Sequence, residues 1–175
     1  MATVHKQHKQ YSRPRKLFEI GRIAEENALV EKYGLKNKRE IWKADALVKK
    51  LRKEAKKLIT ASNDIQEIFI SRLADKGFIK KGSRIDDVLD LKKESILDRR
   101  FQTIVFKKGL AKTPKEARQM IVHRHVFLKD SIVNIPSYFI NLKDESLIKL
   151  KVKSKKEKIV KQEEKPEETP ENASA

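Results

Sequence analysis

The chain has 175 residues, and its 42 lysines and arginines exceed its 25 aspartates and glutamates, giving a net charge of +17 at pH 7. This length holds one ordinary domain or two small ones, and the charge points to a polyanionic partner. The chain has no cysteine, which excludes disulfides and thiolate metal sites and fits a reducing compartment. No apolar run approaches the roughly 20 residues of a membrane span, and the first residues lack the apolar core of a signal peptide. We therefore expect a cytoplasmic protein with no membrane partner.

Residues 1–16 form a basic arm with five lysines and arginines, among them Arg13 and Arg15, and no acid. We expect the arm to be disordered in the free chain, whether it stays solvated or becomes ordered on a nucleic acid. His5 and His8 have a spacing that metal ligands could use. Because no further cysteine or histidine lies near them, we expect neither a metal site nor a cofactor.

Residues 17–94 are expected to form a helical N-terminal domain. The first helix should run from Leu17 to Tyr33 and end at Gly34, followed by a second helix that begins at a capping box over residues 37–40. Apolar residues at helical spacing should form the buried face of each helix. They are Leu17, Ile20, Ala24, Ala28 and Val30 in the first, and Ile41, Ala44, Val48, Leu51, Ala55 and Leu58 in the second. The second set favours a helical hairpin within one chain over a coiled coil between chains.

A third helix should begin at residues 63–66, bury Ile65, Ile68, Phe69 and Leu73, and end at Gly77. The basic turn at 80–84 is the expected hinge between the helical domain and the region that follows. Residues 86–89 should form a short helical turn.

Residues 95–140 contain the most informative patterns. One helix is expected from Ser95 to Lys108, closed by Gly109. Thr113 and Glu116 enclose a proline at the first helical position, which predicts a capped second helix through Val122. The hydrophobic period then becomes two, which predicts strands at 126–128 and 132–135 around a turn, with a last edge strand within residues 145–152.

Positive charge concentrates on this predicted scaffold. Between residues 106 and 129 there are seven lysines and arginines and one acid, for a net charge of +6. A short helical hairpin that holds such a charge rigidly suits a phosphate backbone.

Three motifs in this region, Asp98–Thr103, Lys112–His123 and Val133–Tyr138, resemble the RNA-binding module of the S-four family of small-subunit ribosomal proteins. Further motifs at Tyr11–Arg15, Lys32–Trp42 and Gln102–Ala111 are similar to the archaeal and eukaryotic branch of that family. The resemblance covers residues 11–152. We expect an α+β, predominantly α fold, with a helical N-terminal region packed on a module of two helices and a short antiparallel sheet.

We expect four segments: the arm at 1–16, the helical domain at 17–94, the RNA-binding domain at 95–152 and a charged tail at 153–175, which should be disordered because its end is acidic, contains two prolines and has no aromatic residue. The resemblance implies a non-enzymatic constituent of the small ribosomal subunit. Such a protein would clasp a multi-helix junction in the 5′ domain of small-subunit rRNA, act early in assembly and lie near the mRNA entrance, where it contributes to translational accuracy. Neighbouring ribosomal proteins and mRNA are further expected partners, and no homo-oligomer is expected.

The candidate rRNA-binding residues combine cations for phosphates with polar and aromatic groups for unpaired nucleotides. They are Arg13, Arg15, Arg99, Arg100, Lys107, Lys112, Thr113, Lys115, Arg118, Gln119, His123, Arg124, Lys129, Ser137 and Tyr138.

The sequence departs from the broader superfamily at two of the module's positions. Gln102 stands where an aspartate is usual, so a role for that carboxylate does not carry over. Arg124 stands where glycine is usual, so a positive φ there would cost more than for glycine, and we expect the turn either to differ or to be held by RNA. The bacterial branch's N-terminal cysteine cluster is absent, and its metal site is not expected.

Three other functions compete with this interpretation. An RNA-modifying enzyme would need a catalytic domain, and the sequence has no glycine-rich phosphate loop and no nucleophile paired with histidine. A nonribosomal RNA chaperone could use the same module but would lack the motif at residues 32–42. A protein of anionic membrane surfaces would need a helix with opposed basic and apolar faces, which the pattern does not provide.

Overall fold

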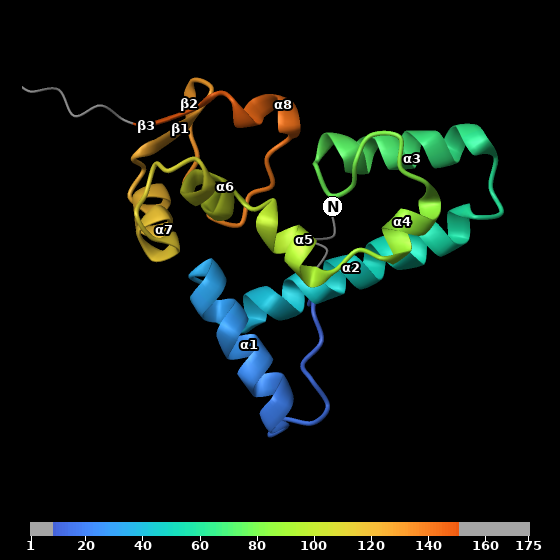
Figure 1. Ribbon diagram of the computed structural model, residues 1–175, viewed down its shortest axis with the longest axis horizontal. Coiled ribbons are helices and arrows are strands. Elements are labelled where there is room, and N and C mark those ends of the chain that lie inside the picture. The colour runs from blue at the N-terminus through green and yellow to red at the C-terminus, as the bar shows by residue number, and fades with distance from the viewer. Residues whose placement is uncertain (1–8, 151–175) are drawn as a thin grey trace, which may run out of the picture.

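The computed structural model describes residues 9–150 (Figure 1). Within this range the chain forms two hydrophobic cores joined by a polar contact. The helices are α1 (Ile20–Tyr33), α2 (Arg39–Leu58), α3 (Asn63–Asp75), α4 (Ile85–Leu89), α5 (Lys93–Asp98), α6 (Phe101–Lys107), α7 (Pro114–Val122) and α8 (Leu142–Glu145). The strands are β1 (Val126–Leu128), β2 (Ser131–Ile132) and β3 (Ile148–Leu150), in the antiparallel order β2-β1-β3. This confirms the predicted α+β, predominantly α fold.

Helix α1 ends as predicted but buries a different face. Gly34 adopts φ 59°, and the Leu35 amide donates to the Val30 carbonyl, which closes the helix with a left-handed glycine. The buried residues are Glu26, Leu29 and Tyr33, while Ile20 is 84% exposed. The face predicted from Leu17, Ile20, Ala24, Ala28 and Val30 is therefore wrong, although Val30 is partly buried.

The side chain of Glu26 explains why α1 buries a different face. Its Oε1 accepts hydrogen bonds from Nε1 of Trp42 at 3.0 Å and from Arg22 at 2.6 Å. Lys38 lies 3.6 Å from the other carboxylate oxygen. A buried carboxylate needs such partners, and a periodicity of apolar residues does not reveal them.

Helix α2 buries the predicted apolar seam, with Leu58 at its end partly buried. The seam packs against α4 and α5 of the same chain. The capping box predicted at residues 37–40 is wrong, because the helix starts at Arg39 after Lys38, which makes no side-chain cap. The Glu40 carboxylate instead pairs with two arginines from the second core.

Helix α3 begins after Ser62 and is followed by Gly77 with φ 72°. Phe69 and Leu73 are buried as predicted, but Ile65 and Ile68 are 50% and 60% exposed, so their predicted burial is wrong.

The basic turn at 80–84 is mostly exposed and connects two segments of the first core, since Phe78 before it and Val88 after it both belong to that core. This does not fit the predicted hinge between two units. The first core continues to Leu97, and the second begins at Phe101. The change from one core to the other therefore takes place at Arg99 and Arg100.

The single helix predicted from Ser95 to Lys108 is wrong, because it is broken between α5 and α6. Arg100 has φ −75° and ψ 146° and forms an isolated antiparallel bridge with Phe139. The Phe101 amide donates to the Tyr138 carbonyl at 2.8 Å. Tertiary hydrogen bonds replace the helical ones at this point.

The second core contains α6, α7 and the sheet. Gly109 follows α6 with φ 71°, and the Thr113 hydroxyl accepts from the Glu116 amide at 3.2 Å, as the predicted cap requires. The Glu116 carboxylate reaches back to the Lys112 amide at 2.7 Å. Ala117 and Ile121 are fully buried. Strand β2 is shorter than the expected 132–135, and β3 supplies the predicted edge strand.

Helices α4 and α5 pack on α2, and α3 runs above α2 with α4 between them in the view of Figure 1. Helix α1 meets α7 of the second core near the start of α2 (Figure 1). No helix between residues 9 and 150 is long and apolar enough to cross a bilayer. The predictions for residues 1–8 and for the tail at 153–175 lie outside the described residues.

Candidate nucleic-acid interface

Five side chains, Glu40, Arg99, Arg100, Gln102 and Arg118, connect the two cores and are called the polar junction below. Arg99 links the end of α3 to the second unit. Its Nε donates to the Lys76 carbonyl at 3.1 Å, its Nη2 to the Ile140 carbonyl at 3.2 Å, and its Nη1 to the Glu145 carboxylate at 3.1 Å. Nε, Nη1 and Nη2 of Arg99 therefore all donate hydrogen bonds within the protein.

Arg100 and Arg118 both pair with Glu40 of α2. Nη2 of Arg100 lies 2.6 Å from Oε2 of Glu40, and Nη2 of Arg118 lies 2.9 Å from Oε1. The side chain of Arg100 is only 8% exposed, and those of Glu40 and Arg118 are 15% and 23% exposed. One carboxylate thus pairs with two cations from the second unit in a largely dry contact, and the three groups together keep one positive charge.

Gln102 completes the polar junction from the first turn of α6. Its Nε2 lies within hydrogen-bond distance of three carbonyls, at 3.0 Å from Tyr33, 3.1 Å from Gly34 and 2.9 Å from Pro114. Its Oε1 accepts from Arg118 at 3.2 Å. An aspartate here would be too short to reach these groups and would lack a donor.

Gly34 explains how α1 and α7 approach so closely. A Cβ at this position would lie 2.9 Å from the Lys115 amide nitrogen and from Pro114. The end of α1 therefore fits against the start of α7 only with glycine, whose φ of 59° also suits it to this position. The polar junction and this contact together fix the angle between the two units.

The carboxyl of Glu40 is held in its charged form. Burial acts to raise its pKa, but the hydrogen bonds and positive charges of Arg118 and Arg100 outweigh burial and lower the pKa below the ordinary value of 4.5. The polar junction is therefore ionised near neutral pH.

The remaining candidate cations differ in whether they pair with a carboxylate. Lys107 pairs with Asp98 at 3.0 Å, and Lys129 pairs with Asp144 at 2.9 Å, both with more than half of the lysine side chain exposed. Lys112, Lys115 and Arg124 are exposed and have no ion-pair partner among residues 9–150. These three residues, called the free basic patch below, lie at the two ends of α7.

Arg124 adopts a positive φ at the position where the superfamily usually has glycine. Its φ is 61°, its amide donates to the Ile121 carbonyl at 3.0 Å, and the next amide, of His125, donates to the Met120 carbonyl at 2.9 Å. The turn after α7 is thus a left-handed helix cap that carries an arginine in place of glycine. Its backbone directs an exposed cation away from the core.

Polar and aromatic candidates lie on the same unit. The rings of His123 and His125 stack with centroids 6.3 Å apart, and Gln119 is exposed on α7. Ser137 and Tyr138 are exposed in the loop before α8. Thr113 is also exposed, but its hydroxyl already accepts the α7 cap bond.

The described part of the basic arm lies along α2. Tyr11 and Trp42 have ring centroids 6.1 Å apart, and Arg13 and Arg15 line a hollow that also contains Trp42. Trp42 donates its Nε1 to Glu26, so its ring is held in place by the helical unit.

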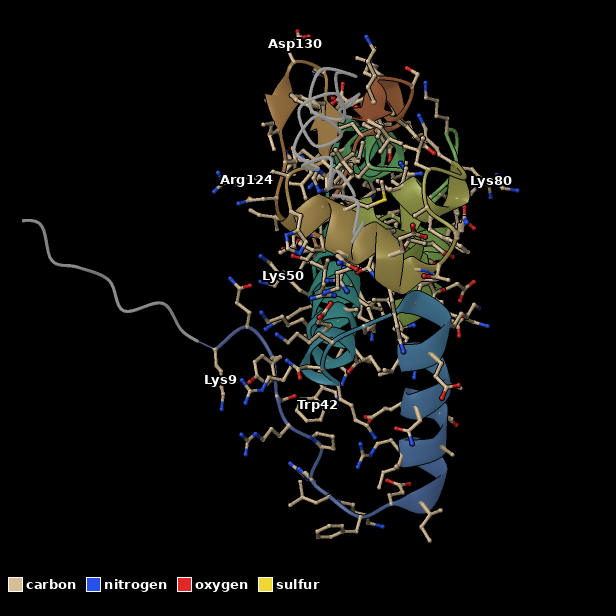
Figure 2. The ribbon with its side chains drawn as sticks, turned by 90° about the vertical axis from the view of Figure 1, so that its left-hand side faces the viewer. Lys9, Trp42, Lys50, Lys80, Arg124 and Asp130 are labelled. Carbon is tan, nitrogen blue, oxygen red and sulfur yellow. The ribbon has the colours of Figure 1, made fainter. Side chains whose placement is uncertain are left out.

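Cations from both units project on one side of the molecule. Figure 2 shows Lys9, Lys50 and Arg124 pointing to the same side, with Lys80 on the opposite one. A polyanion on this side would meet the arm, α2 and the end of α7 together. No group of side chains suited to hold a metal ion occurs within the described range.

A family model described as the S4 domain matches residues 99–146. Curated relatives named small ribosomal subunit protein uS4 match most of the chain. The one from Methanothermobacter thermautotrophicus is 40% identical over 152 residues, which is 85% of this chain and 89% of that protein. Those from Thermoplasma acidophilum and Methanosphaera stadtmanae are 44% and 42% identical, over 81% and 82% of this chain and 74% and 81% of theirs.

Proposed function

This chain belongs to the small ribosomal subunit protein uS4 family, and from this we propose how it binds small-subunit rRNA. Its S4 domain holds the free basic patch at a fixed angle to the helical unit. The observation that carries the proposal is the exposure of Lys112, Lys115 and Arg124 around α7 without an acidic partner among the described residues. Such cations neutralise phosphates and release counterions.

The proposed contact residues are a subset of the candidates. The free basic patch and the arm residues Arg13 and Arg15 would bind phosphates. Lys107 and Lys129 would add exposed but partly neutralised charges. Gln119, His123, Ser137 and Tyr138 would contact unpaired nucleotides by hydrogen bonds or stacking. Thr113 would act through the α7 cap.

Arg99, Arg100 and Arg118 receive a different role in this proposal. Arg99 is engaged by the Lys76 and Ile140 carbonyls and by Glu145. Using Arg100 and Arg118 on phosphates would leave Glu40 buried without its partners. The three arginines would set the angle between the two units and so shape the RNA surface. Folded RNA is recognised largely by shape, so this positioning supports selectivity for one junction.

The target within the subunit is the multi-helix junction of the rRNA 5′ domain, which the two units would clasp together. The protein would bind early in assembly and then lie near the mRNA entrance beside other ribosomal proteins, where it contributes to accuracy. It would act as a single copy. The alternative of an enzyme is set aside, because the curated relatives are ribosomal proteins.

A binding titration at physiological salt tests this proposal. The folded 5′ domain of small-subunit rRNA is titrated against an unrelated RNA of equal length. We expect a preference of about a hundredfold or more, well above salt-driven association. Equal affinities for the two RNAs would contradict the proposal.

A charge-matched pair of variants locates the surface. Replacing Lys112, Lys115 and Arg124 by alanine should make the salt dependence of log K shallower by about three units. The control replaces Lys76, Lys80 and Lys81, three exposed lysines, of which Lys80 lies on the opposite side of the molecule in Figure 2. A larger effect in the control would place the surface elsewhere.

A further inference from the structure

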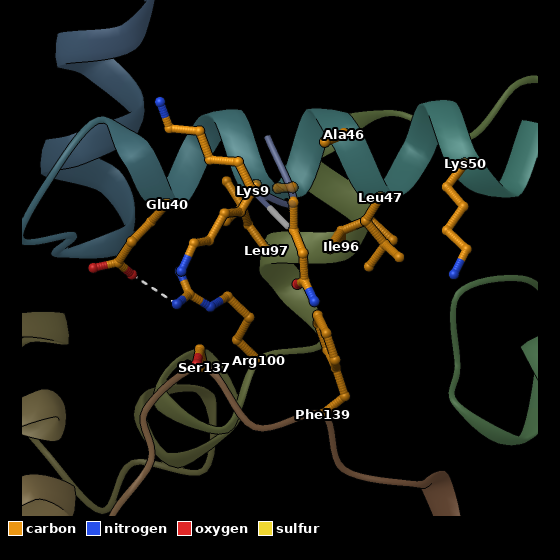
Figure 3. Close-up of a pocket in the computed structure, with 13 residues that line it drawn as sticks. Lys9, Glu40, Ala46, Leu47, Lys50, Ile96, Leu97, Arg100, Ser137 and Phe139 are labelled. Atoms are coloured by element: carbon orange, nitrogen blue, oxygen red, sulfur yellow. Dashed lines mark ion pairs between the residues drawn. The ribbon is translucent and has the colours of Figure 1, made fainter. Parts of the chain in front are cut away.

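A cavity of about 590 Å³ opens between α2 and the segment that joins α8 to the sheet (Figure 3). It lies where the two cores meet. Its walls come from the arm, α2, α5, the break at Arg100 and the loop at 137–139. A volume in this range is typical of sites that take a small ligand.

The cavity has an apolar wall and a cationic rim. Leu47, Ile96, Leu97 and Phe139 form the wall. The ring of Phe139 is fixed edge-to-face against Phe78, with centroids 5.4 Å apart. The rim carries Lys9, Lys43 and Lys50.

The buried guanidinium of Arg100 reaches this cavity with one group unsatisfied. Its Nη2 pairs with Glu40, but Nη1 is buried and has no hydrogen-bond partner among the described residues. An arginine side chain that is 8% exposed rarely leaves a donor unused. Nη1 is covered in the free chain, so an acceptor would satisfy this donor only after the side chains around it have moved.

The acid in the cavity does not oppose an anionic ligand. Glu40 is the only carboxylate among the described lining residues, and both of its oxygens are already paired, with Arg100 and Arg118. Lys50 pairs with Glu54 at 3.9 Å in an exposed contact, and Lys9 and Lys43 add two further cations, so the lining keeps a positive balance. A hydrophobic wall, a positive rim and a buried donor together match a nucleotide, which has a flat base, acceptor groups and a phosphate.

We propose that this cavity receives one unpaired nucleotide of the bound RNA. The inference rests on the proposed function and names one point of contact within it. The phosphate lies at Lys43 and Lys50, the base lies against the apolar wall, and a base oxygen or nitrogen accepts from Nη1 of Arg100. Base stacking and shallow apolar burial are common for unpaired nucleotides on proteins.

The position of the cavity gives this nucleotide a specific consequence. Its walls belong to both units, so the inserted nucleotide contacts both at once. Binding then depends on the angle that the polar junction maintains. Lys9 and Gln10 also line the cavity, so their side chains shift when the nucleotide enters.

Filling the cavity tests the proposal without removing charge. Ala46 lines the cavity from α2 and is partly exposed, so Ala46→Phe blocks the space while the helix is retained. The matched control is Ala28→Phe, at an exposed position of α1 outside the cavity. We expect a loss of affinity of about tenfold or more for A46F, with a shallower salt slope because the displaced nucleotide takes its phosphate away from Lys43 and Lys50, and a change below about twofold for A28F.

Acylation of the RNA 2′-hydroxyls reports the nucleotide directly. One unpaired nucleotide should be protected by the wild-type chain and by A28F but stay reactive with A46F. If A46F binds the rRNA with wild-type affinity, the inference is overturned, because the cavity then receives no nucleotide. This result would also be seen if a neighbouring protein occupied the cavity instead. A wild-type chain without preference for the rRNA would overturn the proposed function together with it.

A second variant covers a failure of A46F to fold. Lys43 and Lys50 are exposed, and the double variant Lys43→Gln and Lys50→Gln leaves the packing untouched. We expect the salt slope to fall by about two units and the same nucleotide to lose protection. An unchanged slope would overturn the placement of the phosphate.

Discussion

The carboxylate of Glu40 lies 2.6 Å from the guanidinium of Arg100 and connects the N-terminal helical core to the core of the S4 domain. The contact is reinforced by Arg118, whose Nη2 lies 2.9 Å from the other oxygen of the same carboxylate. One acid thus holds two arginines that would otherwise be buried with unpaired charges. Removing the Glu40 carboxylate therefore changes the protein at the contact between the two cores.

We expect Glu40→Gln to lower the free energy of unfolding by roughly 3 kcal/mol at pH 7, because two largely buried guanidinium groups lose their counter-charge. The shift in urea midpoint measures this. The control is Glu54→Gln on the same helix, where the carboxylate pairs with Lys50 at 3.9 Å and both side chains are well exposed. That change should cost less than about 0.5 kcal/mol. Equal shifts would show that the polar junction does not stabilise the fold.

The lowered pKa of Glu40 predicts a pH dependence of that difference. Because the pKa is lower in the folded state, the folded chain binds fewer protons, and its stability falls as the pH drops below the ordinary carboxyl pKa of 4.5 towards the folded value. Glu40→Gln lacks this contribution. The difference in urea midpoint between the wild type and the variant should therefore be smaller at pH 3.5 than at pH 7.

This comparison also separates Glu40 from Glu26. Burial raises the pKa of Glu26, but hydrogen bonds from Trp42 and Arg22 and nearby positive charge outweigh it and lower the pKa overall. Glu26 is present in both proteins, so its contribution cancels. A midpoint difference that stays constant from pH 7 to pH 3.5 would contradict the assignment to Glu40.

Local sequence signals predicted those parts of the fold that depend on neighbouring residues. Gly34, Gly109 and the cap at Thr113 lie where a left-handed residue or a side-chain bond ends or begins a helix. The α2 seam was also readable, since its partner helices bury every third or fourth residue. The break at Arg100 was not, because it depends on the Tyr138 carbonyl, 37 residues beyond Phe101 in the chain.

The sequence predicted which types of residue form the candidate site better than it predicted where those residues lie in the fold. Lys115 and Arg118 are three residues apart on one helix, yet the first is exposed and the second pairs with Glu40, 78 residues away. A count of cations treats both alike. Gln102 was recognised as a departure from the superfamily, but its three carbonyl partners come from segments that only the folded chain brings together.

We expect Gln102→Met to lower the free energy of unfolding by about 2 kcal/mol, because the side chain keeps its approximate volume but leaves buried carbonyls without a donor. Differential scanning or urea unfolding gives the value. Gln119→Met is the control, since Gln119 is exposed on α7, and it should change stability by less than about 0.5 kcal/mol. A loss for Gln102→Met no larger than that of the control would mean that the three contacts contribute nothing net.

Arg124→Gly separates the stability of the S4 domain from its affinity for RNA. Arg124 has φ 61°, a conformation that costs a side chain about 1 kcal/mol relative to glycine. The variant should therefore be as stable as the wild type or up to about 1 kcal/mol more stable, as measured by urea unfolding. Because it also loses one phosphate contact, its salt slope should be shallower by about one unit.

The control is Arg124→Gln, which loses the same charge but keeps a side chain at the positive φ. Its RNA affinity should match that of Arg124→Gly, while its stability should match that of the wild type. If Arg124→Gly binds the rRNA with the wild-type salt slope, Arg124 is not part of the interface, and the free basic patch reduces to Lys112 and Lys115. If both variants lose stability equally, the arginine side chain stabilises the turn after α7, and that contribution exceeds the backbone strain.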